Sequence, residues 1–151
     1  MSEELRRKFR EDLEHARSEL VRIAASVTEL IPRATAVLLD GDLEGADLII
    51  RGDDEIDART LDLEEHCLRV MTLQAPVAGD LRQLIALLKM IAEVERSADL
   101  LVNICKAARR IYGHELDPKL RGIISRMSEQ AQQLYTSAIE SFVENDAAKA
   151  A

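Results

Sequence analysis

The chain has 151 residues and a formal net charge of −8, with 47% apolar residues but only 3% aromatic ones. This length suffices for one or two compact domains, and the scarcity of aromatic residues predicts a core of Leu, Ile, Val, Ala and Met. The acidic balance argues against a nucleic-acid-binding protein, which needs a basic face. No apolar run reaches the roughly 18–20 residues that span a bilayer, and the first residues lack the apolar segment of a signal peptide. We therefore expect a cytoplasmic protein with no direct membrane insertion.

Long segments with helical spacing of apolar residues predict an all-α antiparallel bundle of four long helices. These helices are expected over residues 2–40, 43–73, 80–112 and 118–151. Pro32 is expected to kink the first helix, Asp80 to cap the first turn of the third, and Gly113 to end the third. The short connections at 40–43 and 75–79 require the helices on either side of them to pack antiparallel.

The fourth helix reads as a second copy of the first. When the first helix is shifted by 104 positions, identical residues coincide at Leu30/Leu134, Ala34/Ala138, Asp42/Asp146 and Ala46/Ala150. Repeats of this kind are typical of helical proteins built from repeated units. We therefore expect a first three-helix repeat over residues 1–113 and the first helix of a second, incomplete repeat over residues 114–151.

Two acidic pairs stand out on the second and third helices. Asp53 and Asp57 are four residues apart, as are Glu95 and Asp99. On a helical projection Glu95 falls within the apolar arc of the third helix and Asp99 on its edge, while Asp53 lies at the margin of the second helix's buried face and Asp57 just beyond it. Like charges one turn apart repel by roughly 0.2–0.5 kcal/mol even on an exposed helix. A single pair of this kind usually lies on a solvated helix face. Two such pairs on neighbouring helices instead favour a bound cation that offsets the repulsion.

The two pairs lie at matching depth if the second and third helices fold back on each other. Counting outward from the turn places Asp57 level with Asp99, and Asp53 level with about Val102. The four carboxylates then converge on one groove. Oxygen donors of this kind suit Mg²⁺, Ca²⁺, Mn²⁺ or iron better than a thiolate-seeking ion. The sequence therefore predicts a metal site formed by Asp53, Asp57, Glu95 and Asp99.

The order of motifs along these helices, DDEID, then AP, GDLR, ERSAD and NIC, resembles the PhoU family of phosphate-uptake regulators. The resemblance covers essentially the whole chain and is densest from Asp53 to Ala107. It implies two three-helix repeats with acidic motifs that bind metal clusters, at positions that match Asp53, Asp57, Glu95 and Asp99. It favours iron or zinc, with magnesium and manganese open. Ser97 and Ala98 replace the family's usual Ile-Gly pair and leave both carboxylates in place.

The resemblance also implies the partners. A PhoU-like protein would bind a phosphate ABC transporter ATPase, a sensor histidine kinase, or both, and would exert negative regulation on phosphate uptake and starvation signalling. Two other functions stay open: an accessory domain of a phosphate or cation permease, and a purely structural helical bundle. The chain is either a natural single-repeat form or a portion of a longer one.

The remaining residues point to no catalyst. No glycine-rich phosphate loop, nucleophile motif or Glu-x-x-His spacing occurs, so neither an enzyme nor a ferritin-like di-iron bundle is expected. Cys67 and Cys105 fall on apolar faces and read as reduced core thiols. The three histidines are isolated in the sequence and read as ordinary. The fourth helix is not stable alone, so it must either fold back onto the three-helix bundle as a fourth member or pair with the same helix of another copy. Because pairing would cover the apolar patch that it otherwise exposes, we expect a homodimer through this helix or a swapped arrangement.

Overall fold

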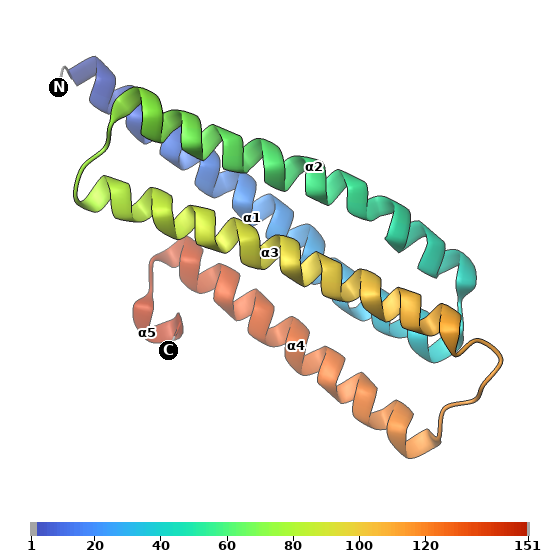
Figure 1. Ribbon diagram of the computed structural model, residues 1–151. Coiled ribbons are helices and arrows are strands. Elements are labelled where there is room, and N and C mark those ends of the chain that lie inside the picture. The colour runs from blue at the N-terminus through green and yellow to red at the C-terminus, as the bar shows by residue number, and fades with distance from the viewer. Residues whose placement is uncertain (1–2, 151) are drawn as a thin grey trace.

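Helices make up the whole architecture of residues 3–150, the part of the chain that the computed structural model describes, and no strand occurs in that part (Figure 1). The helices are α1 (Glu3–Asp40), α2 (Leu43–Gln74), α3 (Gly79–Arg110), α4 (Pro118–Glu144) and the short α5 (Ala147–Ala150). The predicted all-α class is confirmed, and all four long helices begin close to the predicted residues, whereas the fourth ends well before its predicted end. The helix α1 continues across Pro32 without interruption.

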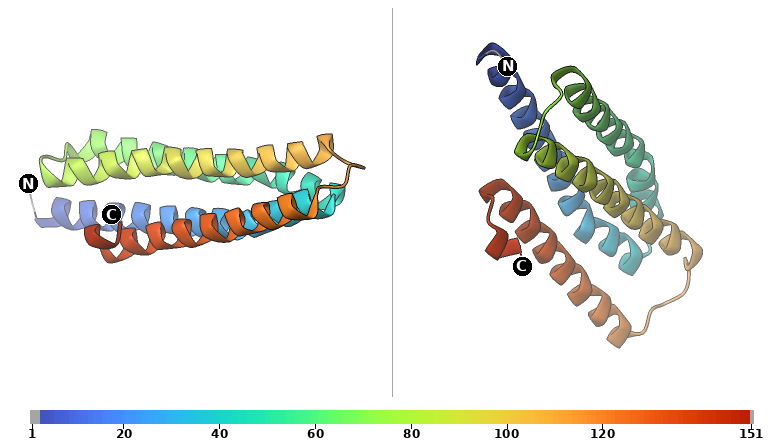
Figure 2. Two further views of the ribbon diagram at one scale, coloured as in Figure 1. Left: turned by 90° about the horizontal axis from the view of Figure 1, so that it is seen from below. Right: turned by 60° about the vertical axis from the view of Figure 1, so that its left-hand side comes forward.

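The first three helices form an antiparallel up-down-up bundle in which each helix contacts the other two. Figure 2 shows two layers, with α2 and α3 in one and α1 and α4 in the other. The backbone of α4 contacts α1 and, among the described residues, comes no closer than 8 Å (between Cα atoms) to α2 or α3 at any point. Thus α1 is the central helix of the molecule.

The core is formed by one apolar seam from each of α1, α2 and α3. Its most deeply buried large side chains are Leu20, Ile23, Val27, Leu84 and Leu87. Burial of a Leu or Ile side chain contributes roughly 1.5–3 kcal/mol. Both cysteines, Cys67 and Cys105, lie in this core as free thiols, as the sequence predicted.

The helices that follow the two turns of the bundle begin in different ways: α2 has a side-chain cap and α3 has none. Gly41 adopts a φ of 66°, and Asp42 then caps α2 through a hydrogen bond that its Oδ1 accepts from the backbone N–H of Gly45 at 2.9 Å. At the second turn the prediction that Asp80 caps α3 is wrong: the cap position is Ala78, which has a φ of 50° and no side-chain cap. Because α3 begins at Gly79, Asp80 lies inside its first turn. There the negative charge of its carboxylate interacts favourably with the positive end of the helix dipole.

The ends of α3 and α4 also differ from expectation. The helix α3 stops at Arg110 rather than at residue 112, and Gly113, with a φ of 83°, lies in the connection beyond it. The predicted fourth helix does not reach the end of the chain. It ends at Glu144, Asn145 adopts a left-handed conformation, and Asp146 then starts α5. A left-handed residue breaks an α-helix by redirecting the chain.

Contacts along α1 hold α4 in place. Arg17 donates hydrogen bonds to the carbonyl oxygen of Phe142 at 3.0 Å and to Oδ1 of Asn145 at 3.1 Å, and its guanidinium lies 4.3 Å from the centre of the Phe142 ring. Farther along, the Thr35 hydroxyl donates to the carbonyl oxygen of Ile31 and accepts a hydrogen bond from the Ser128 hydroxyl of α4 at 2.9 Å. The orientation of α4 is therefore fixed by polar anchors as well as by apolar contact.

A second face of α4, apart from the one that packs on α1, is mostly exposed in the described residues. Shifted by 104 positions, the buried α1 residues Ala16, Leu20, Ile23, Val27, Ala34 and Val37 fall on Leu120, Ile124, Met127, Ala131, Ala138 and Ser141. We call these six residues of α4, together with Leu134, the α4 seam. Met127 is 62% exposed and Leu134 is 73% exposed, whereas Ile23, the counterpart of Met127, is 0% exposed. The residues of α4 that match the core-forming face of α1 are thus mostly left open.

Candidate metal centre

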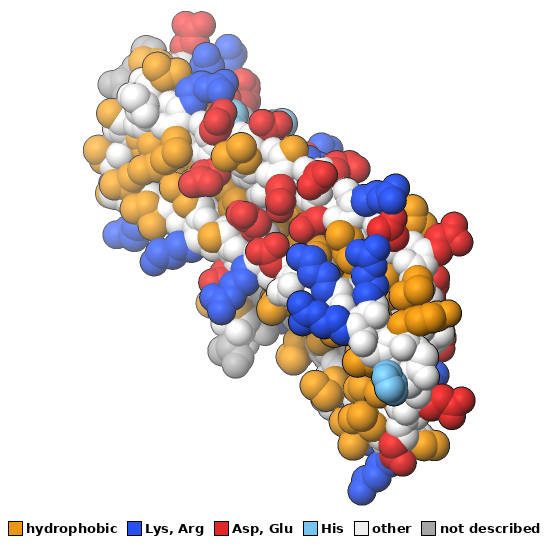
Figure 3. All heavy atoms as spheres, turned by 45° about the vertical axis from the view of Figure 1, so that its right-hand side comes forward, with side chains coloured by type: hydrophobic (Ala, Val, Ile, Leu, Met, Phe, Trp, Pro, Cys, Tyr) orange, Lys and Arg blue, Asp and Glu red, His pale blue; other side chains and the backbone are white. Residues whose placement is uncertain are grey.

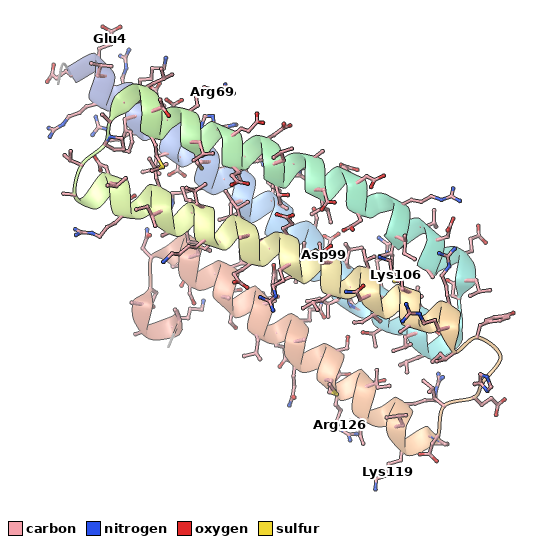
Figure 4. All side chains as sticks on the ribbon, viewed as in Figure 1. Glu4, Arg69, Asp99, Lys106, Lys119 and Arg126 are labelled. Carbon is pink, nitrogen blue, oxygen red and sulfur yellow. The ribbon has the colours of Figure 1, made fainter. Side chains whose placement is uncertain are left out.

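The four predicted ligands lie on the two helices that form the outer layer of the bundle. Asp53 and Asp57 are on α2, and Glu95 and Asp99 are on α3, which packs against α2 along its length. Asp53 is half-buried, whereas Asp57, Glu95 and Asp99 are exposed. In Figure 4, Asp99 lies near the middle of α3, with Lys106 farther along the same helix.

Asp53 is the central residue of the cluster. Its Oδ1 is buried and has no hydrogen-bond partner. Burial is the main reason why the pKa of Asp53 is raised above its ordinary value, and the negative charges of Asp57 and Asp99 raise that pKa further. Lys106 opposes this effect in part. Asp53 therefore lies within electrostatic reach of both Asp99 and Lys106, which agrees with the predicted level near Val102.

Glu95 does not lie where its helical projection placed it. The side chain is exposed rather than within the buried arc, and it is not among the charges that shift the pKa of Asp53. Leu88, Glu95 and Val102 are spaced by one heptad on the same edge of α3, and only Val102 is buried. In a three-helix bundle the buried seam in the middle of a helix is narrow, so the projected arc was too wide there.

The side chains as placed do not form a ready coordination shell. Within residues 3–150, no three His, Cys, Asp or Glu side chains come close enough together to hold a metal ion. The donor chemistry nevertheless fits a hard cation, because all four candidates supply carboxylate oxygens. The orphaned Oδ1 of Asp53 is the atom that a cation would satisfy, since a buried polar atom without a partner is costly.

A basic group adjoins this acidic region. Arg51 pairs with Asp47 of its own helix at 2.5 Å, and Arg109 of α3 pairs with the same carboxylate at 2.9 Å, which links α2 to α3. Figure 3 shows acidic side chains across the middle of this face and a group of basic ones beside them. The basic cluster of Lys106, Arg109 and Arg110 is visible in the sequence and is typical of a solvated helix face, but the pairing of Arg109 with Asp47 was not predicted, because it depends on how α2 and α3 face each other.

The comparisons with known proteins agree with the fold. The PhoU domain family matches residues 20–108. The chain is 34% identical over 141 residues to the "Phosphate-specific transport system accessory protein PhoU homolog" of Aquifex aeolicus, an alignment covering 92% of this chain and 62% of the relative. It is 32% identical over 148 residues to the "Phosphate-specific transport system accessory protein PhoU homolog 2" of Mycobacterium tuberculosis, covering 97% of this chain and 70% of the relative.

A third relative extends the range of organisms. The "Phosphate-specific transport system accessory protein PhoU" of Serratia marcescens is 28% identical over 138 residues, an alignment that covers 91% of this chain and 56% of that protein. The chain thus spans between about half and about two thirds of the length of these relatives. The family match and the helical bundle lead to the same conclusion: this chain belongs to the PhoU family.

Proposed function

We propose that this protein is a metal-binding regulator of phosphate uptake and phosphate-starvation signalling. Its relatives are named as accessory proteins of a phosphate-specific transport system, and this chain has the PhoU domain over residues 20–108. The observation that carries the metal-binding part is the buried, unpartnered Oδ1 of Asp53 beside two further carboxylates.

The ligands we propose are Asp53, Asp57, Glu95 and Asp99. A bound cation would neutralise their mutual repulsion and join α2 to α3. Because the donors are oxygens, Mg²⁺, Mn²⁺ and iron are suited to them, and Zn²⁺ also accepts carboxylate ligands. In this proposal Asp53 anchors the ion from the half-buried position, and the exposed carboxylates turn toward it when it binds.

Metal content tests this assignment. Purified protein would be stripped with chelator and titrated with Mn²⁺, Fe²⁺ and Zn²⁺, and then compared with the double variant Glu95→Ala/Asp99→Ala. We expect the double variant to lose retained metal. The matched control is Asp62→Ala/Glu65→Ala, which removes two exposed carboxylates of α2 outside the cluster. Unchanged metal content in the Glu95/Asp99 variant, or equal loss in the control, would contradict the assignment.

The partners we propose are a phosphate ABC transporter ATPase, a sensor histidine kinase, or both, bound in the cytoplasm without catalysis by this chain. None of the helices in residues 3–150 is both long and apolar enough to cross a membrane. Affinity capture from phosphate-replete cells tests the proposal, with phosphate-starved cells as the control. Recovery of a permease without either proposed partner would favour a transport accessory instead.

We also propose that the 151-residue chain forms a homodimer through the α4 seam. A groove of about 390 Å³ lies between α3 and α4, lined by Leu100, Ile104, Ile124 and Met127 among others. The seam repeats at alternating intervals of three and four residues, the spacing that packs one helix against another. In a dimer with two-fold symmetry, each copy contributes the same surface to the interface. The α4 seam of one copy would therefore pack against the α4 seam of the other.

The oligomeric state tests the homodimer. Sedimentation at micromolar concentration should give a dimer, and Leu134→Glu should give a monomer with unchanged helix content. Val143→Glu is the matched control, because Val143 is an exposed residue of α4 outside the seam. A monomeric wild-type chain, or dissociation by the control variant, would contradict the proposal.

A further inference from the structure

Two histidines that the sequence separates lie against each other between α1 and α2. The ring centroids of His15 and His66 are 5.3 Å apart, and the ring planes are inclined by 75°. Nothing in their spacing connects residues 51 positions apart. The antiparallel packing of α1 and α2 brings them together near the end of the bundle where α1 begins and α2 ends (Figure 1).

The hydrogen bonding of His66 leaves one ring nitrogen available. Its Nε2 lies 3.2 Å from the backbone carbonyl oxygen of Asp12. Because a carbonyl oxygen can only accept, Nε2 carries the hydrogen, and in the neutral ring Nδ1 retains a free lone pair. Metal-binding histidines commonly donate their second ring N–H to a backbone carbonyl in this way, which fixes the tautomer and the ring orientation. His15 is exposed, and its ring has no hydrogen bond within residues 3–150.

The separation of the two rings matches that of two imidazoles on one ion. A metal–nitrogen distance of about 2.0–2.1 Å, added to a ring radius of about 1.2 Å, places each ring centroid about 3.2–3.3 Å from the ion. At a tetrahedral angle the two centroids are then about 5.2–5.4 Å apart. The observed 5.3 Å falls within this interval.

The surrounding charges favour a cation. Asp12 lies one turn before His15, and its Oδ2 accepts a hydrogen bond from Nε2 of Gln74 at 2.7 Å, which holds the carboxylate at this interface. On α2 itself, Arg69 lies one turn beyond His66 with an exposed side chain. Arg59, seven residues before His66, is bound to Glu19 of α1 at 2.8 Å. The positive charge of Arg59 is therefore already compensated.

We propose that His15 and His66 form a two-histidine site for a divalent transition-metal ion: the ring separation fits the tetrahedral geometry of Zn²⁺, and Cu²⁺, which binds imidazole more tightly, also occupies the site, as does Ni²⁺. Imidazole nitrogen suits these ions, and the order of affinity follows the general stability series for divalent metals. Water completes the coordination. The site is separate from the carboxylate cluster, because His66 lies nine residues beyond Asp57, about 14 Å along α2, and its donors are nitrogens.

Cu²⁺ alone is the probe for the test. One equivalent added to the purified chain should give an electron paramagnetic resonance spectrum with two imidazole nitrogens as ligands. His15→Asn should reduce the nitrogen count to one and weaken Cu²⁺ binding at least about tenfold, since even outer-shell partners of a metal ligand act on that scale. Because His15 is exposed, this variant should retain the wild-type circular dichroism spectrum. The matched control is His114→Asn, which changes an exposed histidine in the α3–α4 connection.

A second pair of measurements separates this site from the carboxylate cluster. In Asp53→Asn/Asp99→Asn the two-nitrogen spectrum should persist. Ni²⁺ should raise the melting temperature of the wild-type chain by bridging α1 and α2, and should not raise that of His15→Asn. If His15→Asn and His66→Asn both bind Cu²⁺ as the wild type does, or if the spectrum shows oxygen ligands only, the histidines are merely in ring contact and the proposal is wrong.

Discussion

Asp42 and Asp146 perform the same structural task 104 positions apart. Oδ1 of Asp42 accepts the backbone N–H of Gly45 at 2.9 Å, and Oδ1 of Asp146 accepts those of Ala148 at 2.9 Å and Lys149 at 3.0 Å. A left-handed residue precedes each, Gly41 with a φ of 66° and Asn145 with a φ of 54°. The same order of helix, left-handed residue and aspartate cap thus ends α1 and α4.

The two caps should contribute differently to the free energy of unfolding. Asp42→Ala should destabilise the chain by about 1 kcal/mol, the usual cost of removing a helix cap, because the 32-residue α2 begins there. Asp146→Ala should change stability little, because α5 has four residues and none of them is buried. Chemical denaturation measures both, and Asp42→Asn, which keeps the accepting oxygen, serves as the control. Equal losses from the two alanine variants would contradict this reading.

Asp53 should destabilise the metal-free protein. Asp53→Asn removes a carboxylate. Burial and the neighbouring carboxylates raise the pKa of this group, which means that they disfavour its negative charge. We expect the unfolding free energy at neutral pH to rise by about 0.5 kcal/mol, the scale of like-charge repulsion between helix neighbours. Denaturation in chelator measures this, and Asp62→Asn on the exposed face of α2 is the control. A clear loss of stability would mean that the carboxylate has a stabilising partner.

Helix periodicity was sufficient to predict the bundle. The apolar seam of α3, including Leu84, Leu87 and Ile91, is buried as its spacing required. Periodicity could not predict how wide the buried seam is at each level. That width depends on which neighbours cover the helix, and it explains why Glu95 is exposed while Asp53 is half-buried.

Only some of the contacts between helices could be predicted from the sequence. Counting outward from the turn placed Asp53 level with about Val102, and Asp53 lies within electrostatic reach of Asp99 and Lys106, about one turn to either side of that level, because α2 and α3 are neighbours joined by a short turn. It could not relate His15 to His66, since that contact depends on how α1 and α2 are rotated about their axes. The repeat placed Asp146 where a turn would come, as at Asp42, but the helix was still expected to continue, because the stop depends on one left-handed backbone position at Asn145.

An interhelical ion pair should make the protein less stable in acid. Hydrogen bonding and charge interaction with Arg59 lower the pKa of Glu19 below its ordinary value of 4.5, against a smaller opposing effect of burial. Because the unfolded chain binds this proton more readily, the stabilisation is complete above the unfolded pKa and is lost as the pH falls through the folded one. Glu19→Gln should therefore cost about 0.5–1 kcal/mol at pH 7 and almost nothing at the lowest pH values.

Denaturation between pH 2 and pH 7 measures this difference. The control is Glu29→Gln, an exposed glutamate on the same helix. Parallel stability curves for the wild type and Glu19→Gln across the whole range would show that the Glu19–Arg59 pair does not respond to pH.

The two thiols should be unreactive in the folded protein. Burial, helped by the negative charge of Glu64, raises the pKa of Cys67 to about 11, and burial raises the pKa of Cys105 as well. Since only the thiolate attacks disulfide reagents, a thiol reagent at pH 8 should modify neither cysteine until the chain unfolds. The modification rate should follow the unfolding equilibrium in rising denaturant. Rapid labelling without denaturant would contradict the burial of that side chain.

Arg17 should be the main anchor of the C-terminal half of α4. Replacing it by Met removes two hydrogen bonds and the contact with the Phe142 ring, for an expected loss of about 1–2 kcal/mol. This loss should be local, because the three-helix core does not involve that side chain. Hydrogen exchange should quicken for the backbone of residues 135–144 and stay unchanged in α2.

Two further variants separate geometry from charge. Arg17→Lys keeps the charge but lacks the planar fork that reaches two acceptors at once, so exchange in α4 should still quicken, by less than in Arg17→Met. Arg22→Met is the matched control: Arg22 also borders the groove beside Phe142, but within residues 3–150 its side chain forms an ion pair with Glu19 of its own helix alone, at 3.3 Å. If Arg17→Met left α4 protected as in the wild type, the apolar contacts of Tyr135, Ile139 and Phe142 with the core would be the anchor instead.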